Sequence, residues 1–283
     1  MRGYGGVWKL KPYLKETIWA GTGLDRRYGG KRTGEAYLLS DRPESPCRLW
    51  DGTPFYELRR RLGCGDRPLS LLVKAIDAAE PLSIQVHPPR DGEGRGKDEL
   101  WLMERVAADG AAFIGFRPGV SKEQCRRGGE TGTLCSLLRS VKVSPGDALL
   151  IPGGAVHWGK GLAFYEIQHN CDVTYRLDDH GRGRGLRREE ALAALDPLAE
   201  LRRGRADTLP LLSDGKETPF DLGIIDFRGG FCRAETEPCA FLALSGYGTC
   251  CGEAFAAGDC FFAAAGARSL WEGRGRLLRL GSL

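Results

Sequence analysis

The chain contains 283 residues, and its 41 lysines and arginines outnumber its 37 aspartates and glutamates by four. Such an even balance argues against a protein whose main task is electrostatic binding of nucleic acid or membranes. Apolar residues make up 42% of the chain and charged residues 28%, which is typical of a folded globular protein and excludes a disordered one. No apolar run approaches the roughly 18 residues of a membrane span. Because the N-terminus carries no apolar signal segment, we expect a cytoplasmic protein.

Cysteines and glycines narrow the class further. None of the ten cysteines has the C-x-x-C spacing of a redox or zinc-ribbon motif, so we expect most of them to be small buried residues in a reducing compartment. The 41 glycines are spread between short apolar segments. This distribution indicates many turns and therefore a β-rich fold.

The first half of the chain contains one helical pattern followed by several strand patterns. Apolar periodicity at residues 69–79 predicts a helix. Ser121 followed by Gln124 forms a capping box, which predicts the start of a short helix. Alternating or apolar runs bounded by glycine, proline or polar residues predict strands at residues 82–87, 97–103, 111–116, 141–143 and 148–151.

The second half begins with a further helical pattern at residues 188–201, which Pro197 should end or kink. The polar residues 202–207 look like a linker. From about residue 209, short apolar runs between glycine-rich turns predict a second, smaller β domain. The basic clusters of this half are interpreted as solvated helix ends and linker: RGRGLRR at 182–188 and RRGR at 202–205.

Two of the four histidines lie in positions that suggest a metal site. Gln85 and His87 leave the same face of a predicted strand, Glu99 follows twelve residues later, and His157 follows a Pro-Gly-Gly turn. Two imidazoles and a carboxylate are usual ligands of a catalytic zinc, to which an amide oxygen can add a fourth bond. The same donor set could hold Fe²⁺ or Mn²⁺. Because ligands have no fixed long-range spacing, the alternative that the two histidines are unrelated loop or core residues stays open.

Residues 162–177 alternate over more positions than one small-barrel strand can hold, so we expect a bend or bulge within them. A polar face turned to solvent is the ordinary interpretation of such a stretch. Its mixture of acids, amides and an arginine instead suits a pocket for a polyhydroxylated, anionic ligand. The polar face consists of Glu166, Gln168, Asn170, Asp172, Thr174 and Arg176.

Several of these segments together resemble one protein family, type I mannose-6-phosphate isomerase in its short bacterial form. The matching motifs are LKPYLKETIWAG, RTGEAY, LSIQVHP, GKDELW, VKVSPGDALLIPGGAVHWGKG and EIQHNCDVTYRLDD. They follow one another in the family's order over roughly residues 8–195. The resemblance implies a cupin fold and bound zinc.

The implied fold is mainly β and has two domains. Residues 1–203 would form a metal-binding catalytic cupin domain, which is a jelly-roll β-barrel with added helices. Residues 204–283 would form a smaller, degenerate cupin-like β domain. Within it, the segment at 246–266 resembles a cupin repeat without any histidine, so it should hold no comparable metal site.

The resemblance also implies a role for each matched residue. The zinc ligands fall on Gln85, His87, Glu99 and His157. The active-site residues fall on Lys97, Glu166 and Arg176 for catalysis and on Asn170 and Asp172 for substrate binding. The sequence departs from the family in three places. The loop between His87 and Glu99 is short, which affects the edge of the pocket. His169 replaces a glutamine and His180 replaces an aromatic or acidic residue, which affects the preference among substrates.

The implied reaction uses one zinc ion per chain and interconverts mannose 6-phosphate and fructose 6-phosphate through a cis-enediol. Glu166 is the first candidate for the base and Lys97 the second, while Arg176 stays protonated and stabilises charge or binds an anion. The expected partner is a small sugar phosphate, with no nucleic acid or membrane, and the chain is expected to be a monomer or homodimer. Two rival functions are another metal-dependent cupin enzyme, such as an iron-dependent dioxygenase, and a non-catalytic sugar-binding cupin. The joint presence of Lys97, Glu99, Glu166 and Arg176 argues against a mere binder.

Overall fold

The computed structural model describes residues 4–64, 67–91 and 96–283, and part of the predicted loop between His87 and Glu99 therefore lies outside the described residues. The chain forms two compact units. The first unit comprises residues 1–15, 36–75 and 207–283, and the second comprises residues 16–35 and 76–206. The predicted domains stay a prediction: the units agree with them near residue 206 and differ in grouping residues 1–15 and 36–75 with the C-terminal strands.

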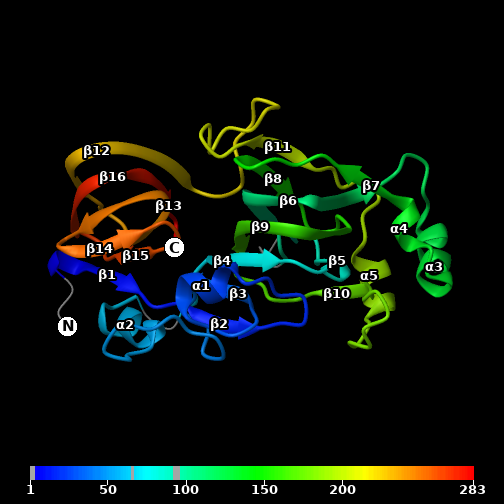
Figure 1. The fold of residues 1–283 in the computed structure, drawn as a ribbon, viewed down its shortest axis with the longest axis horizontal. Coiled ribbons are helices and arrows are strands. Elements are labelled where there is room, and N and C mark those ends of the chain that lie inside the picture. The colour runs from blue at the N-terminus through cyan, green and yellow to red at the C-terminus, as the bar shows by residue number, and fades with distance from the viewer. Residues whose placement is uncertain (1–3, 65–66, 92–95) are drawn as a thin grey trace. The chain divides into compact units, whose positions relative to one another are not determined.

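The first unit is built on a six-stranded antiparallel sheet in the order β1-β15-β13-β16-β12, with β14 paired to β13 (Figure 1). This confirms that the C-terminal part of the chain is β-structure. The strands are β1 (Val7–Leu10), β12 (Leu222–Ala234), β13 (Cys239–Cys250), β14 (Glu253–Ala256), β15 (Cys260–Ala263) and β16 (Arg268–Leu280). The helix α2 (Phe55–Arg61) and the short 3-10 helix η1 (Tyr4–Gly6) belong to the same unit.

Trp271 on β16 lies at the centre of the first unit's core. Its side chain is fully buried, and its indole nitrogen makes no hydrogen bond within the described part of the chain. The ring therefore stabilises the fold through apolar burial and packing. Five phenylalanine rings lie within 6.4 Å of it, centre to centre: Phe227, Phe231, Phe241, Phe255 and Phe261.

We expect Trp271→Ala to lower the free energy of unfolding by about 3–5 kcal/mol, because it leaves a cavity among these rings. Chemical denaturation followed by circular dichroism measures this loss. Trp50→Ala is the matched control, since that side chain is 52% exposed and should cost little. Equal losses in the two variants would contradict the assignment of Trp271 to the core.

The second unit contains most of a ten-stranded antiparallel sheet, in which β11, β8, β6 and β9 lie side by side in that order (Figure 1). The short strand β5 pairs with β9 and β10, and β7 pairs with β6. The strands are β2 (Tyr13–Glu16), β3 (Thr33–Leu39), β4 (Leu71–Ala78), β5 (Ile84–Val86), β6 (Glu99–Phe116), β7 (Leu138–Val141), β8 (Asp147–Ile151), β9 (His157–His169), β10 (Tyr175–Asp178) and β11 (Arg202–Arg205).

The long strand β6 joins two strands that the sequence predicts separately. β9 ends at His169, and an irregular connection leads to β10, so the expected bend in residues 162–177 is present. The helices of this unit are α1 (Gly23–Tyr28), α3 (Lys122–Thr131), α4 (Leu134–Leu137) and α5 (Arg188–Ala194). The capping box at the start of α3 is confirmed: Gln124 N donates to Ser121 Oγ, and Ser121 N donates to Gln124 Oε1.

Two predicted elements are wrong, and a third is shorter than predicted. Residues 69–79 contain the strand β4 instead of a helix, because all of Leu71–Ala78 is buried and an apolar run covered on both faces loses its alternation. The predicted linker at 202–207 contains the strand β11, which pairs with β8. The helix predicted at 188–201 is present as α5, and it ends at Ala194, ahead of Pro197.

Strand β11 is held at its charged side chains as well as along its backbone. Arg203 and Arg205 each form an ion pair with Asp147, with nitrogen to oxygen distances of 3.2 and 2.7 Å. These pairs explain how a polar, arginine-rich segment can form a strand.

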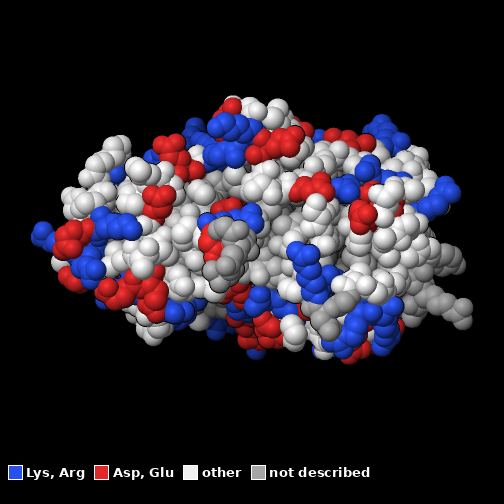
Figure 2. Space-filling view, turned by 180° about the vertical axis from the view of Figure 1, so that it is seen from behind, with Lys and Arg blue, Asp and Glu red and all other residues white. Residues whose placement is uncertain are grey.

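On the face drawn in Figure 2, basic and acidic side chains lie interspersed. Within the described residues, no helix has the length and apolarity needed to cross a membrane.

Candidate metal centre and active site

Three metal-ligand side chains converge in the second unit. His87 directly follows β5, Glu99 begins β6 and His157 begins β9. All three side chains are almost completely buried, and one ligand atom from each lies within 4.8 Å of the others. The pattern of two histidines and a carboxylate expected from the sequence is therefore assembled in space.

Pairing of short segments brings the three residues together. Gln85 on β5 lies opposite His157 in the antiparallel register of β5 and β9. The Pro-Gly-Gly turn before His157 packs against the chain after His87, where a Cβ on Gly153 would lie 2.5 Å from the carbonyl oxygen of Pro88. Only glycine permits this approach, so the turn fixes the distance between the two histidines.

The backbone sets the orientation of both imidazoles. His87 Nδ1 lies 2.8 Å from the carbonyl oxygen of Val173, and His157 Nδ1 lies 2.9 Å from that of Ala155. A carbonyl oxygen only accepts hydrogen bonds, so each Nδ1 carries the proton and, in the neutral ring, each Nε2 carries a lone pair. Burial and the charge of Lys97 lower the pKa of His87 to about 4, which keeps its imidazole neutral at neutral pH.

These lone pairs face the carboxylate of Glu99. His87 Nε2 lies 3.3 Å from Glu99 Oε2, and His157 Nε2 lies 2.9 Å from Glu99 Oε1. Among the described residues, neither oxygen receives a hydrogen bond of good geometry. Lone pairs that converge in this way repel one another, and a cation relieves the repulsion. The ammonium of Lys97 lies against two of these atoms, and a divalent ion would bind all three residues. Ligand atoms at zinc distances in a tetrahedron are about 3.3 Å apart, so these residues fit a divalent metal ion.

Lys97 stabilises the negative charge of Glu99 from one side. Its Nζ lies 2.9 Å from Glu99 Oε2 and 3.3 Å from His87 Nε2, and its side chain is buried. Burial by itself would raise the pKa of Glu99, but the positive charge of Lys97 holds that pKa well below its usual value. The carboxylate is therefore ionised, as a metal ligand must be.

Gln85 lies beside the cluster, with its amide nitrogen toward it. Gln85 Nε2 is 3.2 Å from His157 Nε2, while Ser83 Oγ donates to Gln85 Oε1 at 3.1 Å. In this orientation the amide donates to the lone pair of His157. Rotation of the amide by about 180° would present its oxygen to a metal instead. Gln85 as a fourth ligand stays a prediction.

The predicted catalytic residues lie on strands next to the cluster. Glu166 is buried on β9, and its Oε1 is 3.7 Å from Lys97 Nζ. Arg176 on β10 lies opposite Gln85 in the strand register. Asn170 and Asp172 lie in the connection between β9 and β10, and Asp172 is exposed. The roles predicted for these four residues stay predictions.

Two features of the site have no counterpart in the sequence analysis. The carbonyls of Ala155 and Val173 orient the histidines, and no side-chain pattern could reveal them because every residue has a carbonyl. The basic cluster at 182–188 is also more than a solvated helix end. Arg182 and Arg184 both bind Asp179, a buried carboxylate directly after β10.

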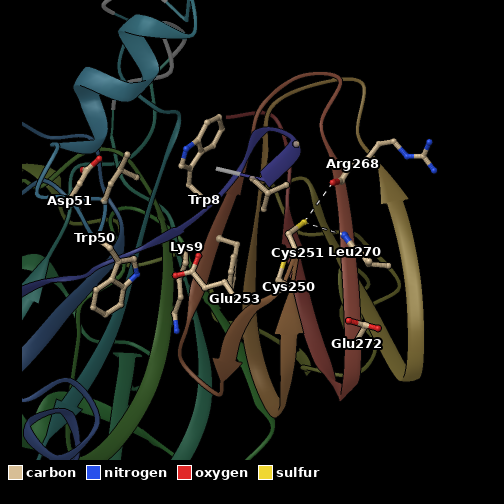
Figure 3. A pocket seen from close by; sticks show the side chains of 15 residues that line it. Trp8, Lys9, Trp50, Asp51, Cys250, Cys251, Glu253, Arg268, Leu270 and Glu272 are labelled. Atoms are coloured by element: carbon tan, nitrogen blue, oxygen red, sulfur yellow. Dashed lines mark hydrogen bonds between the residues drawn. The ribbon is translucent and has the colours of Figure 1, made fainter. Parts of the chain in front are cut away.

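A separate cavity of about 850 Å³ lies within the first unit (Figure 3). Trp8 and Lys9 on β1, the exposed Trp50 and the turn at Cys251 contribute to its wall. Lys9 Nζ lies 2.9 Å from Asp259, and burial raises the pKa of Glu253 beside it. No residue of the predicted metal site belongs to this cavity.

Fold and site together define a cupin-type protein with a buried cluster of two histidines and one carboxylate that can hold a metal ion. No protein-family model matches the chain. Curated relatives do match it. Mannose-6-phosphate isomerase ManA of Bacillus subtilis is 37% identical over 61% of each chain. The probable mannose-6-phosphate isomerase GmuF of the same organism is 31% identical over 66% of this chain and 67% of its own. Mannose-6-phosphate isomerase of Streptococcus mutans is 33% identical over 66% of each chain. The chain belongs to the mannose-6-phosphate isomerase family.

Solved structures extend the likeness along the chain. The crystal structure of Bacillus subtilis mannose 6-phosphate isomerase matches with a TM-score of 0.79 and 25% identity over 97% of this chain and 99% of that one. A putative mannosephosphate isomerase from Archaeoglobus fulgidus matches with a TM-score of 0.75 and 22% identity over 99% of this chain and 98% of its own, which supports the fold alone. In the sequence matches, the chain spans 61% of the length of ManA.

Proposed function

We propose that this protein is a zinc-dependent isomerase that interconverts mannose 6-phosphate and fructose 6-phosphate. The relatives' names supply the reaction, and the buried cluster of His87, Glu99 and His157 supplies a site suited to a metal that such a reaction can use. The observation that carries the proposal is the convergence of His87, Glu99 and His157, since one ligand atom from each lies within 4.8 Å of the others. Two nitrogens and a carboxylate oxygen, with Gln85 as a fourth donor, suit zinc.

The difficult step is removal of a weakly acidic proton from carbon next to a carbonyl group. A bound zinc ion supplies Lewis-acid stabilisation of the negative charge that develops on the substrate's oxygens. Glu166 acts as the base that removes the proton from C2, which gives the cis-enediol, and then returns the proton to C1, which gives the ketose. Its buried position beside Lys97 excludes water from that carboxylate and keeps it close to the cluster.

Lys97 and Arg176 handle charge and proton transfer around the substrate. Lys97 lies between Glu99 and Glu166, so it can donate a proton to a substrate oxygen or polarise it. Arg176 stays protonated and stabilises negative charge. Asn170 and Asp172 would bind the sugar hydroxyl groups. All ten cysteines are free thiols, as expected in a reducing compartment such as the cytoplasm. The proposed enzyme acts there as a monomer or homodimer.

A coupled assay that reports fructose 6-phosphate, combined with metal analysis of the same preparation, tests the proposal. We expect turnover of mannose 6-phosphate together with about one zinc per chain, loss of turnover with a chelator and recovery with added zinc. Oxygen consumption in place of isomerisation would favour an iron-dependent dioxygenase. Sugar phosphate binding without turnover would identify a non-catalytic cupin.

Lys97→Met should reduce kcat about 10²-fold while zinc stays bound, because proton transfer is lost but all the proposed ligands remain. Steady-state kinetics and metal analysis of the same sample measure both effects. Lys160→Met is the control, since Lys160 lies on β9 and pairs with the exposed Asp109. Unchanged kcat in Lys97→Met would remove this residue from the mechanism.

A further inference from the structure

A buried aspartate next to β10 holds two arginines. Asp179 is 4% exposed, and it accepts a hydrogen bond from Arg182 Nη2 at 2.8 Å and another from Arg184 Nε at 2.9 Å. Arg184 Nη2 also donates to the same carboxylate. One carboxylate therefore balances only one of the two guanidinium charges.

The two arginines differ in whether a side-chain nitrogen is available to bind a ligand. Arg182 uses all three of its side-chain nitrogens: Nε binds the carbonyl of Asp179, Nη1 the carbonyl of Pro81 and Nη2 the Asp179 carboxylate. Arg184 binds Asp179 through Nε and Nη2, and within the described chain its Nη1 has no hydrogen-bond partner. Arg184 can thus donate to a further anion without giving up its anchor.

Arg176 connects this pair to the metal cluster. It lies opposite Gln85, whose amide nitrogen is 3.2 Å from His157 Nε2, and its own Nε is buried without a hydrogen-bond partner among the described residues. Burial and the positive charge of Arg184 lower the pKa of Arg176, against the opposing effect of Asp179 and Glu35. The loop that carries Arg184 also returns to Arg176, since Arg187 N donates to the carbonyl oxygen of Arg176 at 2.9 Å.

The loop that returns to Arg176 carries an unbalanced positive charge. Arg182 and Arg184 share the single carboxylate of Asp179, so it balances only one of their two charges. A dianion bound by Arg176 and Arg184 would accept hydrogen bonds from both. Phosphate has this charge and this set of acceptor oxygens.

We propose that Arg184 and Arg176 bind the phosphate group of the sugar phosphate, and that Arg184 selects phosphorylated over neutral sugars. This inference rests on the proposed function, because that function supplies a substrate with a phosphate at one end and a reacting carbon at the other. Arg176 lies opposite Gln85, which is next to the metal cluster, and the loop that carries Arg184 is hydrogen-bonded to the backbone of Arg176. Asp179 acts as a positioning residue that aims Arg184.

Arg184→Met tests the assignment. We expect the KM for mannose 6-phosphate to rise on the order of tenfold or more, because one charge-assisted hydrogen bond is lost, while kcat changes less than about threefold. Activity on unphosphorylated mannose should not fall. Isothermal titration of the metal-loaded protein with inorganic phosphate should show the same loss of affinity, independent of turnover.

Arg182→Met is the matched control, since it removes an equal charge from the same carboxylate, but a side chain whose three nitrogens all bind within the protein. It should leave the KM and the phosphate affinity within about twofold, and Arg184→Lys should recover part of the loss. An unchanged KM and phosphate affinity in Arg184→Met would overturn the assignment, and so would equal losses in Arg182→Met. The proposed function would still be upheld in either case if the wild-type protein has isomerase activity. Phosphate binding that depends on Arg184 in a protein without isomerase activity would uphold the anion site and reject the proposed function.

Discussion

Glu99→Gln is expected to abolish isomerase activity by removing zinc from the protein. The amide keeps the shape of the side chain but removes the negative charge that the two imidazole lone pairs face. It also leaves the ammonium of Lys97 buried 2.9 Å from an uncharged group, which further opposes binding of a cation. Loss of metal stabilisation worth about 4 kcal/mol corresponds to a decrease in kcat/KM of about 10³-fold or more.

Metal content and kinetics of the same preparation measure this effect. Glu104→Gln is the control, because Glu104 lies on the same strand and pairs with Arg27 outside the cluster. It should retain both zinc and activity. If Glu99→Gln kept one zinc per chain and normal turnover, the cluster would not be the metal site.

Arg176→Ala should lose activity and keep its metal. Arg176 belongs to none of the proposed zinc ligands, so zinc stoichiometry should not change. Its guanidinium has a buried Nε with no partner in the described part of the chain, which leaves it available to a negatively charged substrate. Loss of one such charge-stabilising donor typically costs about 10²–10³-fold in rate, and we expect the upper end here because binding of the anionic substrate weakens as well.

Arg187→Ala is the control for this variant. Its backbone N–H donates to the carbonyl of Arg176, and this bond survives the substitution, while its side chain lies at the surface against Tyr175 and Glu190. We expect near-normal kinetics. Full activity in Arg176→Ala would exclude it from both catalysis and substrate binding, and loss of zinc would show that the substitution disturbs the cluster itself.

Structural features that depend only on neighbouring residues could be predicted from the sequence. The capping box of Ser121 and Gln124 is such a case, because its reciprocal hydrogen bonds need only a few neighbouring residues. Residues 69–79 were not predictable in this way. Leu71–Ala78 is buried on both faces, so an apolar run that suits a helix equally suits a covered strand.

Arginine-rich segments were misjudged for a related reason. RRGR at 202–205 reads as solvated when its neighbours are unknown, but Asp147 on β8 provides the opposite charge that allows a strand. The same holds for Arg184, whose partner Asp179 is buried only after folding. Ion pairs between separate segments depend on tertiary structure, and spacing along the chain does not encode them.

The sequence indicated which residue types could bind a metal, but it did not show that they lie close together. Two histidines and a glutamate indicate a set of ligands, but neither composition nor spacing brings His87, Glu99 and His157 together. The resemblance to a family supplied that step, and the pairing of β5 with β9 and the close approach at Gly153 supply its physical basis. The roles of Gln85, Asn170 and Asp172 stay predictions.

Orientation of the two imidazoles by main-chain carbonyls has a consequence for how this protein can evolve. Any amino acid at positions 155 and 173 presents the same acceptor oxygen, so the hydrogen bond to the histidine does not itself select a side chain at either position. Ala155 is restricted for another reason, since it is buried in the core and a larger side chain would not fit. Val173 is only half-buried, so substitutions there should be tolerated as long as the peptide plane stays in place.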